Sequence, residues 1–161
     1  MQRSIRRRRH EAKTDYKARL SLIQSGKPRL VIRRTNRYFT AQIVTTQGAQ
    51  DTVITGVTSR LLLAQGWPAN LQGSLKGLPA AYLTGLLLGV RAKKKCTEAI
   101  VDLGMHRNIQ KSRIYAVLAG VLASGIKIPH DASILPTSET MEKNKKIAET
   151  FKKVKEKIAH G

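Results

Sequence analysis

Cysteine and aromatic residues are scarce in this sequence of 161 residues. Cys96 is the only cysteine, which excludes an intrachain disulfide and a zinc site built from several cysteines and fits a reducing compartment. Aromatic residues make up 4% of the chain. So few flat rings argue against a module that reads single-stranded RNA mainly by stacking bases on aromatic platforms.

Long apolar runs are also missing. No uninterrupted run approaches the roughly 20 apolar residues that a transmembrane helix needs. The basic N-terminal residues are not followed by the apolar segment of a secretory signal. We therefore expect a cytoplasmic protein with no membrane partner.

Acidic residues are few, numbering 10 against 30 lysines and arginines, so the net charge is +20. Residues 1–37 alone hold 13 basic and 2 acidic residues. A compact fold with such an excess repels itself unless a polyanion neutralises it, and neutralising nucleic-acid phosphates releases counterions and raises affinity. An anionic membrane would need a basic amphipathic helix at this end, and the arginine-rich segment lacks an apolar face. The charge therefore predicts a nucleic-acid partner.

Few carboxylates are present that could form a catalytic site. Asp51, Glu98, Asp102 and Asp131 are the only acids between residues 38 and 138. A metal-dependent nuclease needs carboxylates that converge on an ion, and positions four apart on a strand, such as Glu98 and Asp102, lie about 13 Å apart. The cations before Cys96 would lower the pKa of a reactive thiol, but a structural thiol is the favoured interpretation. No nucleophile motif or phosphate loop is present, so we expect no enzyme, metal, cofactor or small-molecule substrate.

Between residues 29 and 58 the sequence predicts β-strands. β-Branched and aromatic residues predict strands over residues 29–35, 38–45 and 52–58, the first two joined by a tight turn at Asn36-Arg37. Residues 98–103 predict a short strand covered on both faces. A strand-rich half followed by helix, strand and helix predicts an α/β fold with a mixed sheet and helices packed on it.

Helices are predicted where capping residues precede apolar periodicity. A short helix over residues 59–65 would take Ser59 as its N-cap, and a long one would run from Pro79 to about Lys95. Gly85 and Gly89 in the long helix indicate close packing against the sheet. A further helix would be capped by Ser112 and bury the apolar stripe at 114, 117, 118, 121 and 122.

Composition divides the chain into three parts. Residues 1–26 form a basic arm running into a short helix, and residues 27–130 form the α/β core. Residues 131–161 form a linker and an amphipathic helix whose apolar stripe docks on protein or on RNA. That stripe consists of Ile147, Phe151, Val154 and Ile158.

Two basic clusters are the candidate binding residues. The arm carries a run of four arginines, whose planar guanidinium groups bind phosphate in a bidentate manner and stack on bases. Arg33, Arg34 and Arg37 gather at the predicted hairpin, together with Asn36 and Tyr38. A rigid hairpin that presents cations and one aromatic ring predicts a surface for structured RNA.

Five segments, in order and with the right spacing, resemble the universal large-subunit ribosomal protein eighteen family, which binds 5S rRNA. They are RRRRHEAKTDYKARL (6–20), GKPRLVIRRTNRYFTAQIV (26–44), LPAAYLTGLLLG (78–89), EAIVDLG (98–104) and RIYAVLAGVLASGIKIPH (113–130). The KTDY arm and the loop containing Gly66-Trp67 are similar to members of archaeal type. The KNKKI segment (143–147) departs from the family pattern in the tail.

The resemblance implies a mixed sheet of ribonuclease H-like topology without its catalytic acids. It implies a place in the central protuberance, where the protein would link 5S rRNA to the large-subunit rRNA beside universal protein five and other neighbouring ribosomal proteins. The residues that match RNA-facing motifs of the family are Arg6, Arg7, Arg8, Arg9, Lys13, Tyr16, Arg19, Arg29, Arg33, Arg34, Asn36, Arg37, Tyr38, Ser74 and Lys76. The rival interpretations are a structured-RNA binder or chaperone without 5S preference, and a ribonuclease H-like hydrolase.

Overall fold

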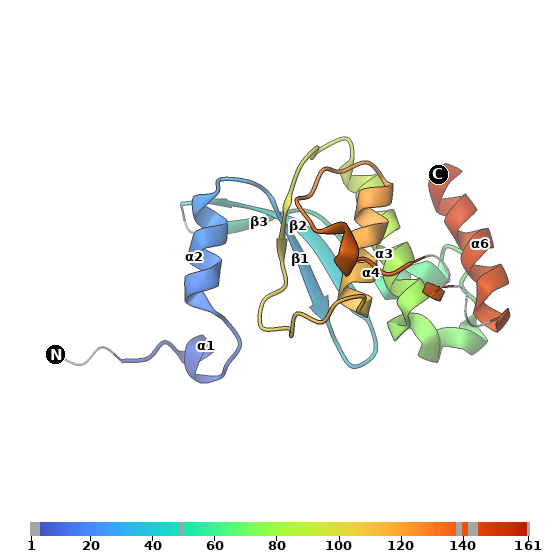
Figure 1. Ribbon diagram of the computed structural model, residues 1–161, viewed down its shortest axis with the longest axis horizontal. Helices are drawn as coiled ribbons and strands as arrows, with labels where there is room; N and C mark the ends of the chain where they lie inside the picture. The colour runs from blue at the N-terminus through green and yellow to red at the C-terminus, as the bar shows by residue number, and fades with distance from the viewer. Residues whose placement is uncertain (1–3, 49, 138–139, 142–144, 161) are drawn as a thin grey trace.

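The computed structural model describes residues 4–48, 50–137, 140–141 and 145–160. Its centre is a four-stranded sheet in the order β3-β2-β1-β4 (Figure 1). The strands are β1 (Arg29–Arg34), β2 (Phe39–Gln47), β3 (Gln50–Thr58) and β4 (Ile100–Asp102). β2 is antiparallel to both β1 and β3, whereas β4 runs parallel to β1. The predicted α/β class with a mixed sheet is confirmed.

The strand pattern follows from alternation of side chains. Phe39, Ala41 and Ile43 are fully buried on one face of β2. On β1, Leu30 and Ile32 are buried on the same core face, because side chains two apart on a strand share a face. The strand predicted over residues 98–103 forms only as β4, at the edge of the sheet. It is shorter than expected because Gly104 at φ +60° turns the chain at one end, and at the other end Glu98 forms only an isolated bridge with Lys127.

Helices α3 (Leu78–Ala92) and α4 (Arg113–Ala123) pack on each other and against the core face of the sheet (Figure 1). Their backbones touch at glycines. A Cβ on Gly85 would lie 2.0 Å from the carbonyl oxygen of Val117, and a Cβ on Gly120 would lie 2.0 Å from that of Tyr82. The expectation that Gly85 and Gly89 pack against the sheet is therefore wrong, because both glycines face α4.

The segments between the strands and α3 are 3-10 helices, η1 (Ser59–Leu63) and η2 (Ala69–Lys76). Ser59 does not cap η1 as predicted. It is buried, and its Oγ accepts a hydrogen bond from the backbone N–H of Phe39 at 3.1 Å. Ser112 occupies the N-cap position of α4 without making a side-chain cap bond. Ser59 therefore bonds a strand instead of capping a helix, whereas the Ser112 hydroxyl is buried and has no hydrogen-bond partner among the described residues.

The N-terminal segment lies at one end of the molecule and consists of α1 (Arg7–His10) and α2 (Tyr16–Gln24) (Figure 1). Asp15 caps α2, since its carboxylate accepts hydrogen bonds from the backbone N–H groups of Lys17 and Ala18. Neither helix buries a side chain. The segment therefore depends on surface contacts for its position.

At the other end, α6 (Lys145–His160) packs on α3. Phe151, Val154 and Ile158 are buried there, and the Phe151 ring lies 5.7 Å from that of Tyr82, centroid to centroid. The apolar stripe thus docks on protein. Part of the predicted linker and two residues of the KNKKI segment, Lys143 and Asn144, lie outside the described residues. Among the described helices, none has the length and apolarity to cross a membrane.

Candidate nucleic-acid interface

The turn between β1 and β2 is held closed by Thr35. The Thr35 backbone N–H donates to the carbonyl of Tyr38 at 2.9 Å, and the Tyr38 N–H donates to the Thr35 hydroxyl at 3.0 Å. Arg34, Asn36 and Arg37 are exposed around this turn. The hairpin therefore presents two guanidinium groups and an amide from a backbone of fixed geometry, as RNA recognition by shape requires.

Segment η2 lies opposite the hairpin turn, and a pocket of about 260 Å³ opens between them. The amide nitrogen of Gln72 donates to the hydroxyl of Tyr38 at 3.4 Å and connects the two walls. Lys76, predicted as an RNA contact, lines this pocket. The residues that line the pocket are Asn36, Arg37, Tyr38, Gln72, Gly73 and Lys76. Ser74 is half-buried and donates to the carbonyl of Leu71 instead, so it stabilises η2 from within.

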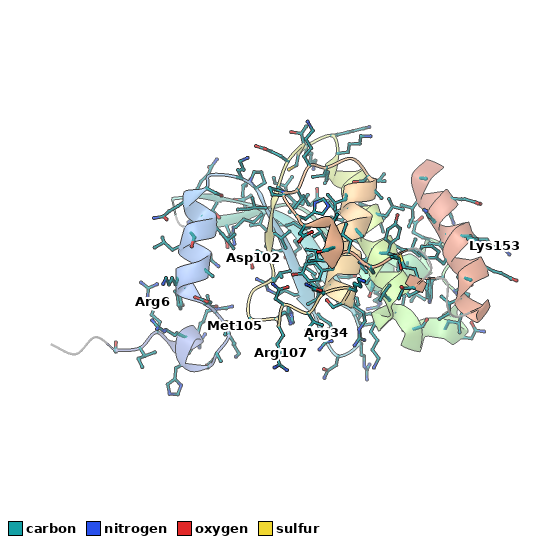
Figure 2. All side chains as sticks on the ribbon, viewed as in Figure 1. Arg6, Arg34, Asp102, Met105, Arg107 and Lys153 are labelled. Atoms are coloured by element: carbon teal, nitrogen blue, oxygen red, sulfur yellow. The ribbon has the colours of Figure 1, made fainter. Side chains whose placement is uncertain are left out.

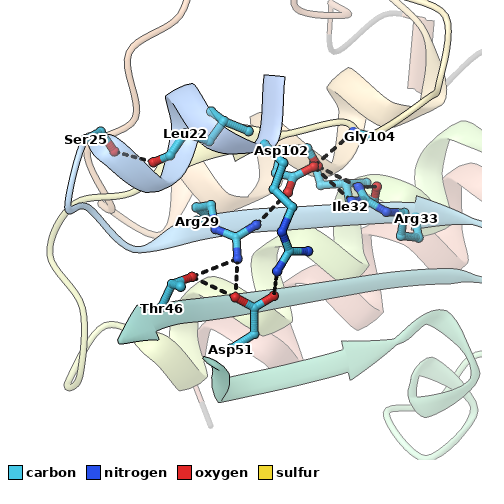
Figure 3. A network of polar contacts seen from close by, with 10 residues as sticks. Leu22, Ser25, Arg29, Ile32, Arg33, Thr46, Asp51, Asp102 and Gly104 are labelled. Carbon is cyan, nitrogen blue, oxygen red and sulfur yellow. Dashed lines mark hydrogen bonds and ion pairs between the residues drawn. The ribbon is translucent and has the colours of Figure 1, made fainter. Parts of the chain in front are cut away.

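Arg29 and Arg33 belong to a polar network on the face of the sheet away from α3 and α4 (Figure 3). The Arg29 side chain is only 3% exposed and bridges Asp102 at 2.9 Å and Asp51 at 2.8 Å. Arg33 is 40% exposed, and one of its nitrogens bonds Asp102 at 2.8 Å. The sequence placed Arg29 among the RNA contacts, but the structure places it in the interior, and we assign it to this network instead.

Asp51 joins the N-terminal segment to the sheet. Its carboxylate accepts from Arg29, from the Thr46 hydroxyl at 2.7 Å and from Arg19 of α2 at 2.7 Å (Figure 3). Burial raises the pKa of Asp51, but the hydrogen bonds from Thr46 and Arg29 and the charges of Arg29 and Arg19 outweigh burial and hold this pKa below 3.8. Arg19 is therefore paired with Asp51, and its side chain, which is 38% exposed, leaves only part of the guanidinium group open to RNA.

The arginines of the arm are exposed. Arg8 donates to the Thr14 hydroxyl at 2.9 Å, and the guanidinium of Arg6 lies 4.8 Å from the centre of the Tyr16 ring. Lys13 pairs with Glu11 at 2.7 Å, a surface contact of little stabilising value. A groove of about 1060 Å³ is lined by residues of the segment before α2, by α2 itself and by Asp51. Its basic lining residues are Arg6, Arg8, Arg9 and Arg19.

The loop between β4 and α4 adds cations that the sequence reasoning missed. Arg107 and Lys111 are exposed, and Met105 and Ile109 beside them are 54% and 58% exposed. Figure 2 shows Arg6, Met105, Arg107 and Arg34 along one side of the view, with Lys153 at the far end. The signal was present, since residues 105–113 contain three cations and no acid.

His106 ties this loop to the hairpin. Its Nε2 accepts a hydrogen bond from the backbone N–H of Arg34 at 3.2 Å. Burial lowers the pKa of His106, and the charges of Arg33 and Arg34 lower it further. A lowered pKa favours the neutral ring, which keeps this acceptor, so the hydrogen bond joins the basic loop to the hairpin.

Three of the carboxylates considered for a nuclease site are engaged by cations, and two of these flank the same guanidinium, that of Arg29. Asp51 and Asp102 are neutralised by arginines, and Glu98 pairs with Lys27 at 3.0 Å. Within the described residues, no group of three or more His, Cys, Asp or Glu side chains is placed to hold a metal ion. Burial raises the pKa of the Cys96 thiol, which is the opposite of what a reactive cysteine needs. The described residues thus give the hydrolase interpretation no support.

Fold and surface together define a class, namely a basic α/β protein that presents cations on a rigid hairpin and a helical arm, as binders of structured RNA do. A family sequence model described as "Ribosomal large subunit proteins 60S L5, and 50S L18" matches residues 1–98. The chain therefore belongs to this family of large-subunit ribosomal proteins. It is a structural constituent of the large subunit of the cytoplasmic ribosome, where it binds rRNA and neighbouring proteins, and it is not an enzyme.

Similar proteins come from archaea. The large ribosomal subunit protein uL18 of Korarchaeum cryptofilum is 50% identical over 134 residues, which are 83% of this chain and 67% of that protein. Those of Methanospirillum hungatei and Methanococcus maripaludis are 44% and 43% identical over 83% and 84% of this chain and 74% and 68% of their own length. The expected family and its archaeal type are confirmed.

Proposed function

We propose that this chain binds 5S rRNA and attaches it to the large-subunit rRNA in the central protuberance, beside universal protein five. The observation that carries the proposal is the rigid hairpin, which His106 joins to a second basic loop. Arg34 and Arg37 are exposed on a closed turn, and His106 connects that turn to the loop carrying Arg107 and Lys111. Fixed cations select an RNA shape, because wrong shapes leave them without a phosphate partner.

The three parts of the chain have different tasks in this proposal. The core, residues 27–130, presents the hairpin and η2 to one RNA segment. The arm, residues 1–26, lies along the backbone of another segment, where the exposed arginines of α1 meet phosphates. In the C-terminal part, residues 131–161, helix α6 braces α3. The RNA-contacting residues are Arg6, Arg7, Arg8, Arg9, Lys13, Tyr16, Arg19, Arg33, Arg34, Asn36, Arg37, Tyr38, Lys76, Arg107 and Lys111.

A structured-RNA binder without 5S preference is the second candidate, and the net charge of +20 favours it. Electrostatic attraction to phosphate is independent of sequence and accounts for most non-specific binding. The two candidates differ in how they treat a competing RNA. A binder that uses charge alone has no means to prefer one folded RNA over another of similar size and charge density.

The test is a filter-binding titration against 5S rRNA, with tRNA as competitor, at near-physiological salt. The proposal expects 5S rRNA to bind at least about a hundredfold more tightly than tRNA, a threshold set below the roughly 10³–10⁷ that specific binding typically gains over non-specific binding. Replacing Arg34 and Arg37 with alanine should remove most of this preference. The matched control replaces Lys153 and Lys157, two exposed cations of α6, and should leave it intact. Equal binding of both RNAs by the unmodified protein would favour the second candidate.

A further inference from the structure

The pocket between the hairpin turn and η2 has the size and lining of a site for a single small ligand. Its volume of about 260 Å³ lies just below the roughly 300 Å³ at which pockets for drug-sized ligands begin. The pocket is lined by two cations, Arg37 and Lys76, by the amides of Asn36 and Gln72 and by the ring of Tyr38. Its described lining includes no carboxylate, so the pocket attracts an anion.

Both walls of the pocket are fixed by contacts outside it. Thr35 closes the hairpin turn, and the buried Ser59 accepts from the backbone N–H of Phe39, next to Tyr38. On the other wall, the indole N–H of Trp67 donates to the carbonyl of Leu71 at 3.2 Å. The Arg113 guanidinium donates to the carbonyl of Lys76 at 3.1 Å. A pocket with anchored walls is formed before any ligand arrives, so binding does not have to order it.

We infer that this pocket receives one nucleotide that an RNA loop has turned out of its base stack, an inference that rests on the proposed RNA binding. The base lies against Tyr38, because unstacked bases in RNA–protein complexes stack on exposed aromatic rings. Asn36 and Gln72 each carry a hydrogen-bond donor and an acceptor and can pair with a base edge. Arg37 and Lys76 bind the flanking phosphates.

The pocket takes a base from a loop and not from a duplex. A paired base has its hydrogen-bonding edge occupied and is stacked on both sides, so it cannot enter a pocket of this size. Turning a base out costs a few kcal/mol, and the cost is least for a base that is already single-stranded. The site therefore adds recognition of one unpaired position to a surface that otherwise reads the phosphate backbone.

Gly73 offers a way to block the pocket without removing charge. Its φ lies outside the left-handed region, and a Cβ placed on it meets nothing within 4 Å, so a side chain there causes no strain and extends into free space. Gly73→Leu should fill the pocket and keep the fold. Asn70→Leu is the matched control, because Asn70 is exposed on the same 3-10 helix but does not line the pocket.

The experiment has two arms. In the first, AMP, GMP, CMP and UMP are titrated separately to millimolar concentration into the full-length protein while NMR follows the Gly73 backbone amide and the side-chain amides of Gln72 and Asn36. At least one nucleotide should shift these signals in a saturable way, in the unmodified protein and in Asn70→Leu but not in Gly73→Leu. Absence of shifts with all four nucleotides overturns the inference.

In the second arm, Gly73→Leu is titrated with 5S rRNA. Its affinity should fall by about tenfold to a hundredfold, in line with the loss of one stacked base, while the slope of log affinity against log salt stays unchanged. Affinity equal to that of Asn70→Leu overturns the inference. If mononucleotides bind at Gly73 but 5S rRNA is not preferred over tRNA, the proposed function is wrong and the nucleotide site in the pocket is supported. If 5S rRNA is preferred but no mononucleotide binds, the proposed function is supported and the nucleotide site is wrong.

Discussion

Asp102 accepts hydrogen bonds from Arg29, Arg33 and the backbone N–H of Gly104, at distances of 2.8 to 2.9 Å. Its side chain is 9% exposed, so its charge is tolerated only because these donors surround it. The same contacts hold Arg33 close to the sheet and fix the start of the loop that carries Arg107. One buried carboxylate thus positions parts of the proposed RNA surface without touching RNA.

Replacing Asp102 with alanine should lower the free energy of unfolding by about 3–5 kcal/mol, because it leaves the buried guanidinium of Arg29 with a single acidic partner. Urea unfolding measures this loss. Glu98→Ala is the control, since its pair with Lys27 is about half exposed and such surface pairs contribute about 0–1 kcal/mol. Equal losses in the two variants would contradict the structural role assigned to Asp102.

Asp51 predicts a pH dependence of stability. Its pKa in the folded protein is below the ordinary 3.8, so its stabilising contribution is fully present above that pH and disappears as the pH falls through the folded value. The difference in free energy of unfolding between the unmodified protein and Asp51→Asn should be constant near neutral pH and shrink below pH 3.8. Urea titrations across an acidic pH series measure it. A difference that grows on acidification would have the wrong sign.

Arginines in one strand show what the sequence could and could not predict about the candidate site. Arg29 and Arg34 are the same residue type five positions apart, and the sequence treats them alike. Arg34 is exposed at the turn, whereas Arg29 meets Asp102, 73 positions further on, and Asp51. Contacts over such separations depend on strand order, and the local pattern does not contain that order. Arg107 was missed for a different reason, because it lies in a loop without periodicity.

At the level of elements, the helix pair α3 and α4 depends on glycine. Gly85 and Gly120 let each helix backbone approach the other, so no Cβ fits at either contact. Periodicity predicted both helices and most of their length. It did not predict which surface each glycine faces, since a helix buried on most sides offers more than one partner. The partner of α6 was open for the same reason, because an apolar stripe shows that a face is buried and does not name its partner.

Helix propensity and helix packing give opposite expectations for the stability of the Gly85→Ala variant. Helix propensity alone predicts that alanine stabilises the helix by about 1 kcal/mol. The 2.0 Å approach to the Val117 carbonyl predicts instead that α3 and α4 must separate, with a loss of about 1–3 kcal/mol or more. Urea unfolding decides the sign. Gly73→Ala is the control, because its Cβ has no neighbour and its stability should stay close to that of the unmodified protein.

Across the whole molecule, cations occur at both ends, but they differ in setting. The arm and its neighbouring loop and hairpin lie along one side of the view, and the exposed lysines of α6, such as Lys153, lie at the far end (Figure 2). α6 itself is anchored by buried apolar residues on α3, whereas α1 buries no side chain. The arm can therefore change its contacts when RNA arrives without any loss of core packing.

This difference predicts how salt affects binding. Replacing Arg6, Arg7, Arg8 and Arg9 together with glutamine should reduce the slope of log affinity for 5S rRNA against log salt by up to about 3.6, since each of the four phosphate contacts contributes roughly 0.7–0.9. The free energy of unfolding should stay unchanged, because these side chains are exposed. Filter binding at several salt concentrations measures the slope. Replacing Lys153 and Lys157 should leave the slope as it is. An unchanged slope in the arm variant would remove the arm from the interface and leave the hairpin as the main source of phosphate contacts.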